Sequence, residues 1–231
     1  MKPVSRLTLC ALAVVLLASP RLLTAQTPGA GSHAFQWYWG GGGGAFLYKT
    51  NLQPLHFDPI IGGHWLITGK RTALYLSYEQ AFFTTAAVAQ IADANSGSGV
   101  RNASFSNVRR LSIGVMAMPI DGHIQPMIGG GFSIMQILNP TIDCSGADAT
   151  TTCASFSDSS LAAQAASDQA SKAFAWGAFG LQINFGRLGL YGLASVTSSA
   201  QQFMLDGPTY SVVGGIRYSL GSSKEDITDD H

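Results

Sequence analysis

Charge is scarce in this 231-residue chain, since only 11% of its residues are Asp, Glu, Lys or Arg. Soluble domains typically carry about 25%. The residues after position 25 contain ten basic and 13 acidic side chains, which gives a net charge of −3. Nucleic-acid binding requires clustered Lys and Arg, so this balance argues against a nucleic-acid partner.

Long apolar runs are also missing from the chain. A membrane-spanning helix needs about 20 apolar residues, and the apolar run Leu7–Leu17 is shorter than that. It follows a basic start and precedes a small-residue cleavage site before Gln26, so residues 1–25 predict an export signal peptide. Residues 26–34 would then form a short lead, and an uncleaved anchor is the alternative.

Cysteine is rare, and the pattern of the three residues present does not suggest a metal site. Cys10 lies in the predicted signal peptide, while Cys144 and Cys153 share a polar segment without a nearby histidine. An even pair in an exported chain predicts a disulfide that closes a small loop.

The motifs of common enzymes are absent as well. The sequence contains no paired histidines with zinc-ligand spacing and no GxSxG nucleophile motif. We therefore predict no metal, no cofactor and no catalytic site. A Ser/His/Asp site assembled from distant strands is left open as an alternative, because such sites are not contiguous in sequence.

The chain does contain repeated segments in which apolar and polar or small residues alternate with period two. Phe179 and Leu181 take one face of such a segment, and Gln182 and Asn184 take the other. Segments of about 10 residues with this alternation, separated by turn signals, are typical of membrane β-barrels. The eight segments are 35–48, 57–67, 73–83, 108–118, 124–138, 173–185, 188–198 and 209–220.

The connections between these segments alternate between short and long. A membrane barrel keeps short turns on the periplasmic side and longer loops outside. We therefore predict an all-β fold: an eight-stranded antiparallel up-and-down transmembrane β-barrel over residues 35–221, with ten strands as the alternative. The short turns are 68–72, 119–123 and 185–189, and the longest connections are 84–107 and 139–172.

The two longest connections are the candidate contact sites for an extracellular ligand or protein partner. Their Ala-rich parts, 84–94 and 159–172, are typical of short helices, the second with a possible N-cap. The acidic end 222–231 is expected to be a disordered tail. The sequence leaves the oligomeric state open.

Charged residues on the polar faces of the segments predict a polar network inside the barrel. Glu79 and Arg217 each lie opposite the apolar stripe of their strand, and a buried charge needs a partner. The alternative is that either side chain reaches water at the rim. The predicted network comprises Glu79, Arg110, Gln182, Asn184 and Arg217, with His64 as an optional member.

Aromatic residues gather near the ends of the segments. Tyr and Trp favour the membrane interface, because one end of the side chain is apolar and the other forms hydrogen bonds. The run Gly40–Gly44 lacks the ending of a phosphate-binding loop and is interpreted as part of a strand. The predicted aromatic girdle consists of Trp37, Trp39, Trp65, Tyr75, Trp176, Tyr191, Tyr210 and Tyr218.

With these features the chain resembles the small outer-membrane barrels of the outer-membrane protein A, X and W types. The resemblance covers residues 35–221 and includes the last segment, GGIRYSLG. It implies a bacterial outer-membrane location, outer-membrane lipid as a partner, no cofactor, and a structural, adhesive or interaction role. In this chain Leu220 stands where the family often ends on an aromatic residue. The alternatives are a small-solute channel, a lipid-modifying barrel enzyme and a soluble exported barrel.

Overall fold

The structure is a computed structural model that describes residues 34–93, 99–120, 122–142 and 156–224. Strands dominate because the segments alternate side chains of different polarity, which suits a sheet with two unlike faces. The elements are β1 (Ala34–Tyr48), β2 (His56–Thr68), β3 (Thr72–Ala92), β4 (Val100–Ala117), β5 (Ile124–Leu138), β6 (Thr141–Ile142), α3 (Phe156–Asp168), β7 (Ser171–Phe185), β8 (Leu188–Thr197) and β9 (Thr209–Lys224).

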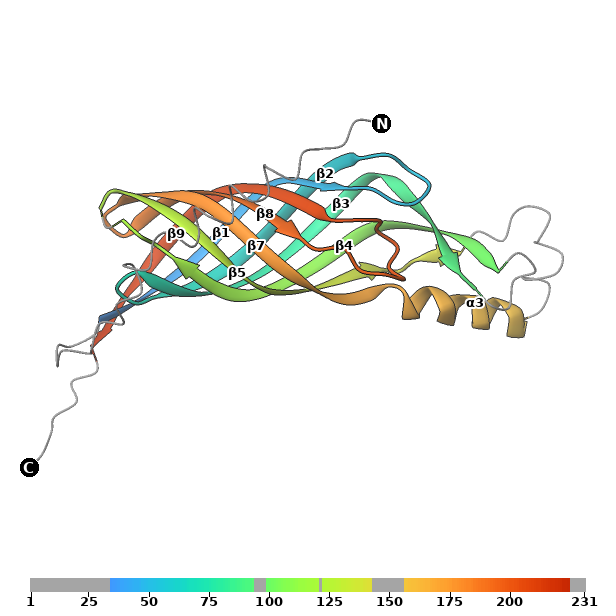
Figure 1. The fold of residues 1–231 in the computed structure, drawn as a ribbon. Coiled ribbons are helices and arrows are strands. Elements are labelled where there is room, and N and C mark those ends of the chain that lie inside the picture. The colour runs from blue at the N-terminus through green and yellow to red at the C-terminus, as the bar shows by residue number, and fades with distance from the viewer. Residues whose placement is uncertain (1–33, 94–98, 121, 143–155, 225–231) are drawn as a thin grey trace, which may run out of the picture. The chain divides into compact units, whose positions relative to one another are not determined.

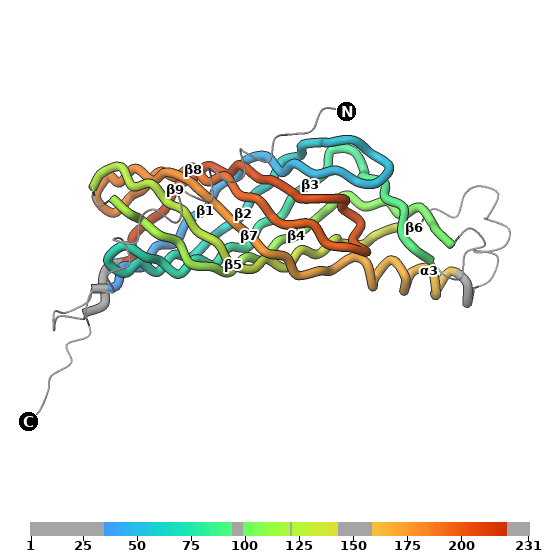
Figure 2. Tube along the Cα trace, in the orientation of Figure 1, coloured from blue at the N-terminus to red at the C-terminus, as the bar shows by residue number. Residues whose placement is uncertain are grey.

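Eight of these strands close into one antiparallel barrel (Figure 1, Figure 2). Successive barrel strands pair with each other, and β9 pairs with β1 to close the sheet. The two-residue strand β6 lies beside β4 and does not enlarge the barrel. The predicted eight-stranded, antiparallel, up-and-down barrel is therefore confirmed in preference to the ten-stranded alternative.

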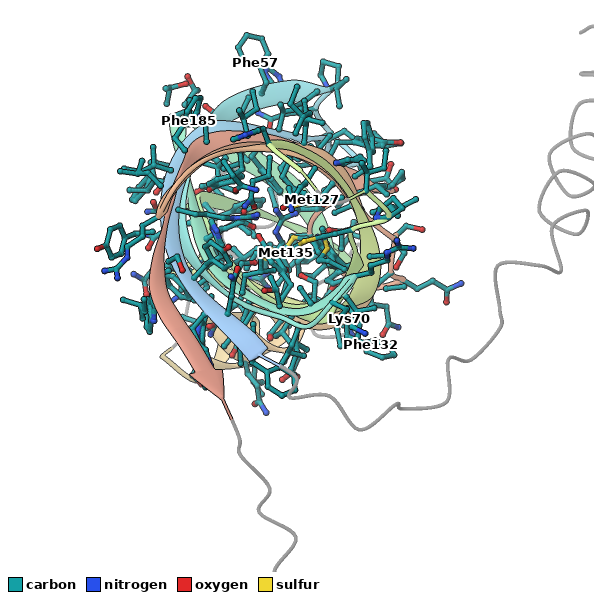
Figure 3. All side chains as sticks on the ribbon, turned by 90° about the vertical axis from the view of Figure 1, so that its left-hand side faces the viewer. Phe57, Lys70, Met127, Phe132, Met135 and Phe185 are labelled. Atoms are coloured by element: carbon teal, nitrogen blue, oxygen red, sulfur yellow. The ribbon has the colours of Figure 1, made fainter. Side chains whose placement is uncertain are left out.

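The two faces of the barrel wall have opposite character. On the outside, Phe57 is 77% exposed and Phe132 is 70% exposed, whereas Arg217 is completely buried. The end-on view shows Phe57, Phe132 and Phe185 projecting away from the barrel (Figure 3). Met135 lies within the ring of strands in the same view. The predicted direction of the alternation is confirmed, and a soluble barrel would have the opposite arrangement.

The glycine run of β1 is a strand, as expected, and its inward glycines are required by close packing. A Cβ at Gly40 would lie 2.4 Å from the His64 ring and 2.7 Å from Arg217 Cγ. A Cβ at Gly44 would lie still closer to the backbone oxygen of Val212. These glycines leave space for large interior side chains and for the neighbouring strand.

The connections differ in size at the two ends of the barrel. The short-turn end holds the brief turns that follow β2, β4 and β7, together with the end of β9. The long-loop end holds residues 49–55 and 198–208, the connection between β3 and β4, and the segment with β6 and α3. Short and long connections thus alternate as the sequence indicates.

Strands β3 and β4 extend well beyond the barrel at the long-loop end, which corrects two predictions. The expected helix at 84–94 is wrong, because β3 continues to Ala92, and most of the predicted loop 84–107 is a β-hairpin. After an irregularity at Phe82, pairing resumes from Ala87↔Phe105 to Ala92↔Val100. The inward side chains of this extension are buried, so packing overrides the helical preference of its alanines.

Helix α3 confirms that the second Ala-rich segment is helical, with earlier bounds than expected. It ends at Asp168 rather than at 172, because β7 already begins at Ser171. The helix buries Ala162 and Ala166, which let its backbone approach the rest of the protein closely. Within the described residues, no helix is long and apolar enough to cross a membrane.

Candidate functional site

The middle of the barrel holds an ion pair between neighbouring strands, which we call the mid-barrel cluster. Glu79 of β3 and Arg110 of β4 are directly opposite in the strand register. Nε and Nη2 of Arg110 both donate to Oε2 of Glu79, the first at 2.8 Å. Arg110 Nη2 also donates to Ser211 Oγ at 2.7 Å, and Ser211 forms a hydrogen bond with Ser195. The side chains are almost completely buried, so the pair has little competition from water.

A second group surrounds Arg217 nearer the short-turn end, and we call it the Arg217 cluster. Arg217 Nε donates to Nε2 of His64, and Nη1 donates to Oε1 of Gln182. Gln182 in turn donates from Nε2 to Oδ1 of Asn184. The guanidinium carbon lies 4.3 Å from the ring centroid of Tyr191, a cation–π distance.

The predicted polar residues are all placed in or beside the barrel interior, but they form two groups. Glu79 and Arg110 belong to one, and Arg217, Gln182 and Asn184 belong to the other. Among the described residues, no hydrogen bond or ion pair connects the two. Aromatic rings lie beside the Arg217 cluster instead: His64 stacks on Tyr75, and Tyr75 on Trp176.

Those aromatic rings correct part of the predicted girdle. Tyr75, Trp176 and Tyr191 are 2%, 4% and 7% exposed, so they are interior residues and do not face the surroundings of the barrel. Strand parity contains the missed signal, because Tyr75 lies on the same face as Glu79 and Trp176 on the same face as Gln182. The outward face carries Trp37, Trp39, Trp65, Tyr210 and Tyr218. Trp65 stacks on Trp39 and is tilted against Trp37.

Several interior partners escaped the sequence analysis because their residue types are common in loops and strands alike. Ser195, Ser211 and Thr197 bind Arg110 directly or through one another. Near the long-loop end, Asp58 accepts hydrogen bonds from the Tyr48 hydroxyl and from the backbone and hydroxyl of Thr84. Which residues these side chains contact depends on the register between strands, which the sequence alone does not give.

The β3 extension has one edge without a neighbouring strand, and side chains cover that edge. Asn51 accepts from Gln90 N and donates to Gln90 O, both at 2.8 Å. Gln169 makes the same pair of bonds with Ala92. Side-chain amides thus replace the missing strand and block strand addition at this edge. The backbone of Val88 is covered by two side chains: the Thr50 hydroxyl donates to Val88 O, and Gln53 Oε1 accepts from Val88 N.

The long-loop end also carries a buried ion pair and a pocket. Arg101 and Asp93 lie within 2.9 Å of each other at the tip of the hairpin. The pocket has a volume of about 600 Å³ and is formed by the segment Ser199–Gly207 with Asn51. The predicted disulfide between Cys144 and Cys153 lies outside the described residues.

The described part of the chain contains no group of three His, Cys, Asp or Glu side chains that could hold a metal ion. The interior clusters instead place cations against carboxylate, amide, imidazole and aromatic partners.

A crystal structure of neisserial surface protein A matches this structure with a TM-score of 0.53 and 9% identity, over 79% of this chain and 96% of that chain. The fold is that of the small outer-membrane β-barrels. The predicted resemblance to these barrels is thereby confirmed at the level of fold. Neither a protein-family model nor a curated protein sequence matches the chain.

Two further small outer-membrane barrels, both from Pseudomonas aeruginosa, match less well. The N-terminal β-barrel domain of OprF gives a TM-score of 0.47 at 8% identity, over 82% of this chain and 99% of that chain. The outer membrane protein OprG gives 0.42 at 10% identity, over 83% and 98%.

Proposed function

We propose that this protein is an integral outer-membrane β-barrel, exported by its N-terminal signal and oriented with the short-turn end in the periplasm. The observation that carries the proposal is the inverted wall, with large apolar side chains exposed and charged side chains buried inside. Exposed apolar residues occur around all eight strands, so the outer surface suits hydrocarbon rather than water. The fold shared with neisserial surface protein A supports the same conclusion.

Within the membrane the barrel acts as a plugged scaffold rather than a wide pore. The largest fully buried side chains include Arg217, Tyr75, Met116 and Met135, which fill the interior at several levels. Eight strands enclose a space that side chains can fill. The interaction surface is the long-loop end, where the hairpin of β3 and β4 and the segment around α3 contact an extracellular ligand or protein.

Heat-modifiable gel mobility tests the membrane barrel. The full chain is expressed in a bacterium with an outer membrane, and the outer-membrane fraction is run with and without boiling. A folded barrel migrates differently until boiled, and the protein is expected in this fraction. Recovery in the soluble periplasmic fraction, with mobility unchanged by boiling, would overturn the proposal.

A pair of substitutions tests the outward face directly. Phe132→Arg places a charge in the middle of the apolar wall, where Arg costs about 2–4 kcal/mol in a membrane barrel. Leu52→Arg is the matched control, since Leu52 is 47% exposed in a connection at the long-loop end. We expect only Phe132→Arg to lower recovery of heat-modifiable protein. Equal recovery of the two variants would favour a soluble barrel.

Conductance in planar bilayers separates the plugged scaffold from the small-solute channel. We expect no steady channel current from the purified full chain, since bulky side chains occupy the interior. A regular conductance that scales with the amount of folded protein would support the channel instead.

A further inference from the structure

Arg109 of β4 is an exception to the inverted wall. Its neighbours Val108 and Arg110 are 2% and 3% exposed and point inward, so Arg109 is on the outward face. Among the strand side chains that the structure describes, it is the one charged residue on that face. The inward faces hold Asp58, Glu79, Arg101, Arg110, Lys172 and Arg217.

Polar residues extend from Arg109 along the register of three neighbouring strands. Arg109 is opposite Gln80 of β3 on one side and Gln136 of β5 on the other. Gln136 is in turn opposite Ser171 of β7. Directly opposite residues share one face of a sheet, so all four point outward. We call this set the Arg109 row.

Arg109 lies where the apolar surface of β4 ends on the side of the long-loop end, while on β3 the exposed Phe82 lies farther toward that end. Toward the short-turn end, β4 presents Leu111, Ile113 and Val115, which are 45%, 52% and 57% exposed. On β5, Ile134 and Phe132 occupy the same levels. The row is therefore the first polar level beyond a continuous apolar surface on β4. Under the proposed function, on which this inference rests, that level meets the head groups of the outer leaflet.

One nitrogen of the Arg109 guanidinium lacks a partner in the described part of the protein. Its Nε is buried and has no hydrogen-bond partner among the described residues. Two of the buried arginines have a carboxylate partner, Arg110 with Glu79 and Arg101 with Asp93, whereas Arg217 has only neutral acceptors and one nitrogen, Nη2, without a partner among the described residues. The outward face of the neighbouring strands contains no acidic residue within the described range. An arginine at a membrane surface can pair with an anionic group from outside the chain.

We propose that the Arg109 row binds a phosphate group on the head of an outer-leaflet glycolipid. Arg presents two parallel N–H groups that match a phosphate bidentately. The amides of Gln80 and Gln136 and the hydroxyl of Ser171 are further donors along the same line. The apolar residues on the short-turn side of the row would contact the acyl chains of the same lipid. For this reason the row suits a phosphate carried by a lipid better than a free phosphate ion.

Lipid titration of the purified full chain in detergent, read by native mass spectrometry, tests this site. The probes are diphosphorylated lipid A, its dephosphorylated form and phosphatidylglycerol. We expect Arg109→Gln to weaken retention of diphosphorylated lipid A by about tenfold, the loss of one charged contact. Retention of the dephosphorylated probe is expected to be the same in wild type and variant. Lys70→Gln, which removes an exposed charge at the short-turn end, is expected to behave as wild type.

A variant of the flanking amides and a folding control complete the test of the site. Gln80→Ala with Gln136→Ala removes the flanking amides and is expected to weaken retention less than Arg109→Gln does. Equal retention of diphosphorylated lipid A by wild type and Arg109→Gln would overturn the site, and so would tighter retention of phosphatidylglycerol. Heat-modifiable mobility of each variant reports folding. A wild-type chain that lacks this mobility refutes the membrane barrel itself, whereas a heat-modifiable chain without phosphate dependence refutes only the site.

Discussion

The mid-barrel cluster and the Arg217 cluster hold buried arginines in one interior by different means. Arg110 has a carboxylate directly opposite it on the adjacent strand, so the pair is neutral and local. Arg217 is instead flanked in the register by Gly40 of β1 and Gly189 of β8. Neither glycine offers a partner, and both leave space beside the guanidinium.

Because of that space, the hydrogen-bond partners of Arg217 come from strands beyond its immediate neighbours, while the ring of Tyr191 on the adjacent β8 faces the guanidinium. His64 is on β2, and Gln182 is on β7. The Sδ atom of Met127 on β5 is 3.1 Å from Nη1. The ion pair of the mid-barrel cluster thus joins two adjacent strands through opposite charges, while the hydrogen bonds of Arg217 reach β2, β5 and β7 through neutral acceptors. We infer that the stability of the mid-barrel cluster depends on the pairing of opposite charges. The stability of the Arg217 cluster depends on the room that Gly40 and Gly189 leave for the guanidinium.

The largest expected effect comes from breaking the charge balance. Glu79→Ala leaves Arg110 buried without a carboxylate, and we expect it to lower the free energy of unfolding by about 3–5 kcal/mol. Urea unfolding of the barrel in lipid vesicles, followed by tryptophan fluorescence, measures the change. The double variant Glu79→Met with Arg110→Met removes both charges and is expected to be close to wild type. A loss in the double variant as large as in the single one would contradict the charge-balance account.

Filling the space beside Arg217 is the next test. Gly40→Ala introduces a methyl group 2.4 Å from the His64 ring, and overpacking of this kind costs about 1–3 kcal/mol. Gly41→Ala is the matched control one residue along, since its nearest neighbour is the Gly62 oxygen at 3.6 Å. The same unfolding measurement compares the two. Similar losses for both variants would mean that the space beside Arg217 is not what matters.

Removing the unbalanced cation should cost less than breaking the ion pair. Arg217→Met takes donors away from His64 and Gln182 but also removes a buried charge. We expect a net loss of about 1–2 kcal/mol in the free energy of unfolding, well below that of Glu79→Ala. If Arg217→Met proved the more damaging of the two, the distinction between the clusters would have to be abandoned.

The smallest effect is expected for the neutral helpers of the ion pair. Ser211→Ala removes the 2.7 Å hydrogen bond from Arg110 and should cost about 1 kcal/mol. Thr197→Val removes a 3.4 Å contact with the same arginine and should cost less. Urea unfolding of the two variants gives the loss in the free energy of unfolding for each. A larger loss for Thr197→Val than for Ser211→Ala would show that the distances do not reflect the strengths of the two hydrogen bonds.

Prediction from sequence succeeded where local alternation was sufficient. The outward position of Phe179 and Leu181 and the inward position of Gln182 follow from parity alone. It failed for Tyr75, Trp176 and Tyr191, which were assigned to the outer girdle because they lie near strand ends. Their alternation with neighbouring residues places them on the inward face. It also failed at 84–94, where the alanines favour a helix but the paired hairpin buries Ala87 and Ala89.

Single-residue alternation, turn residues and connection lengths predicted eight strands, their order, and the inward face of Glu79, Gln182 and Arg217. These properties are local, since the period of a strand is two regardless of its neighbours. The tertiary structure decided which interior residues meet. Closure of the barrel sets the register between strands, and a shift of that register would give Glu79, Arg110 and Arg217 different partners. The division into two clusters, and the outward row around Arg109, exist only because of that register.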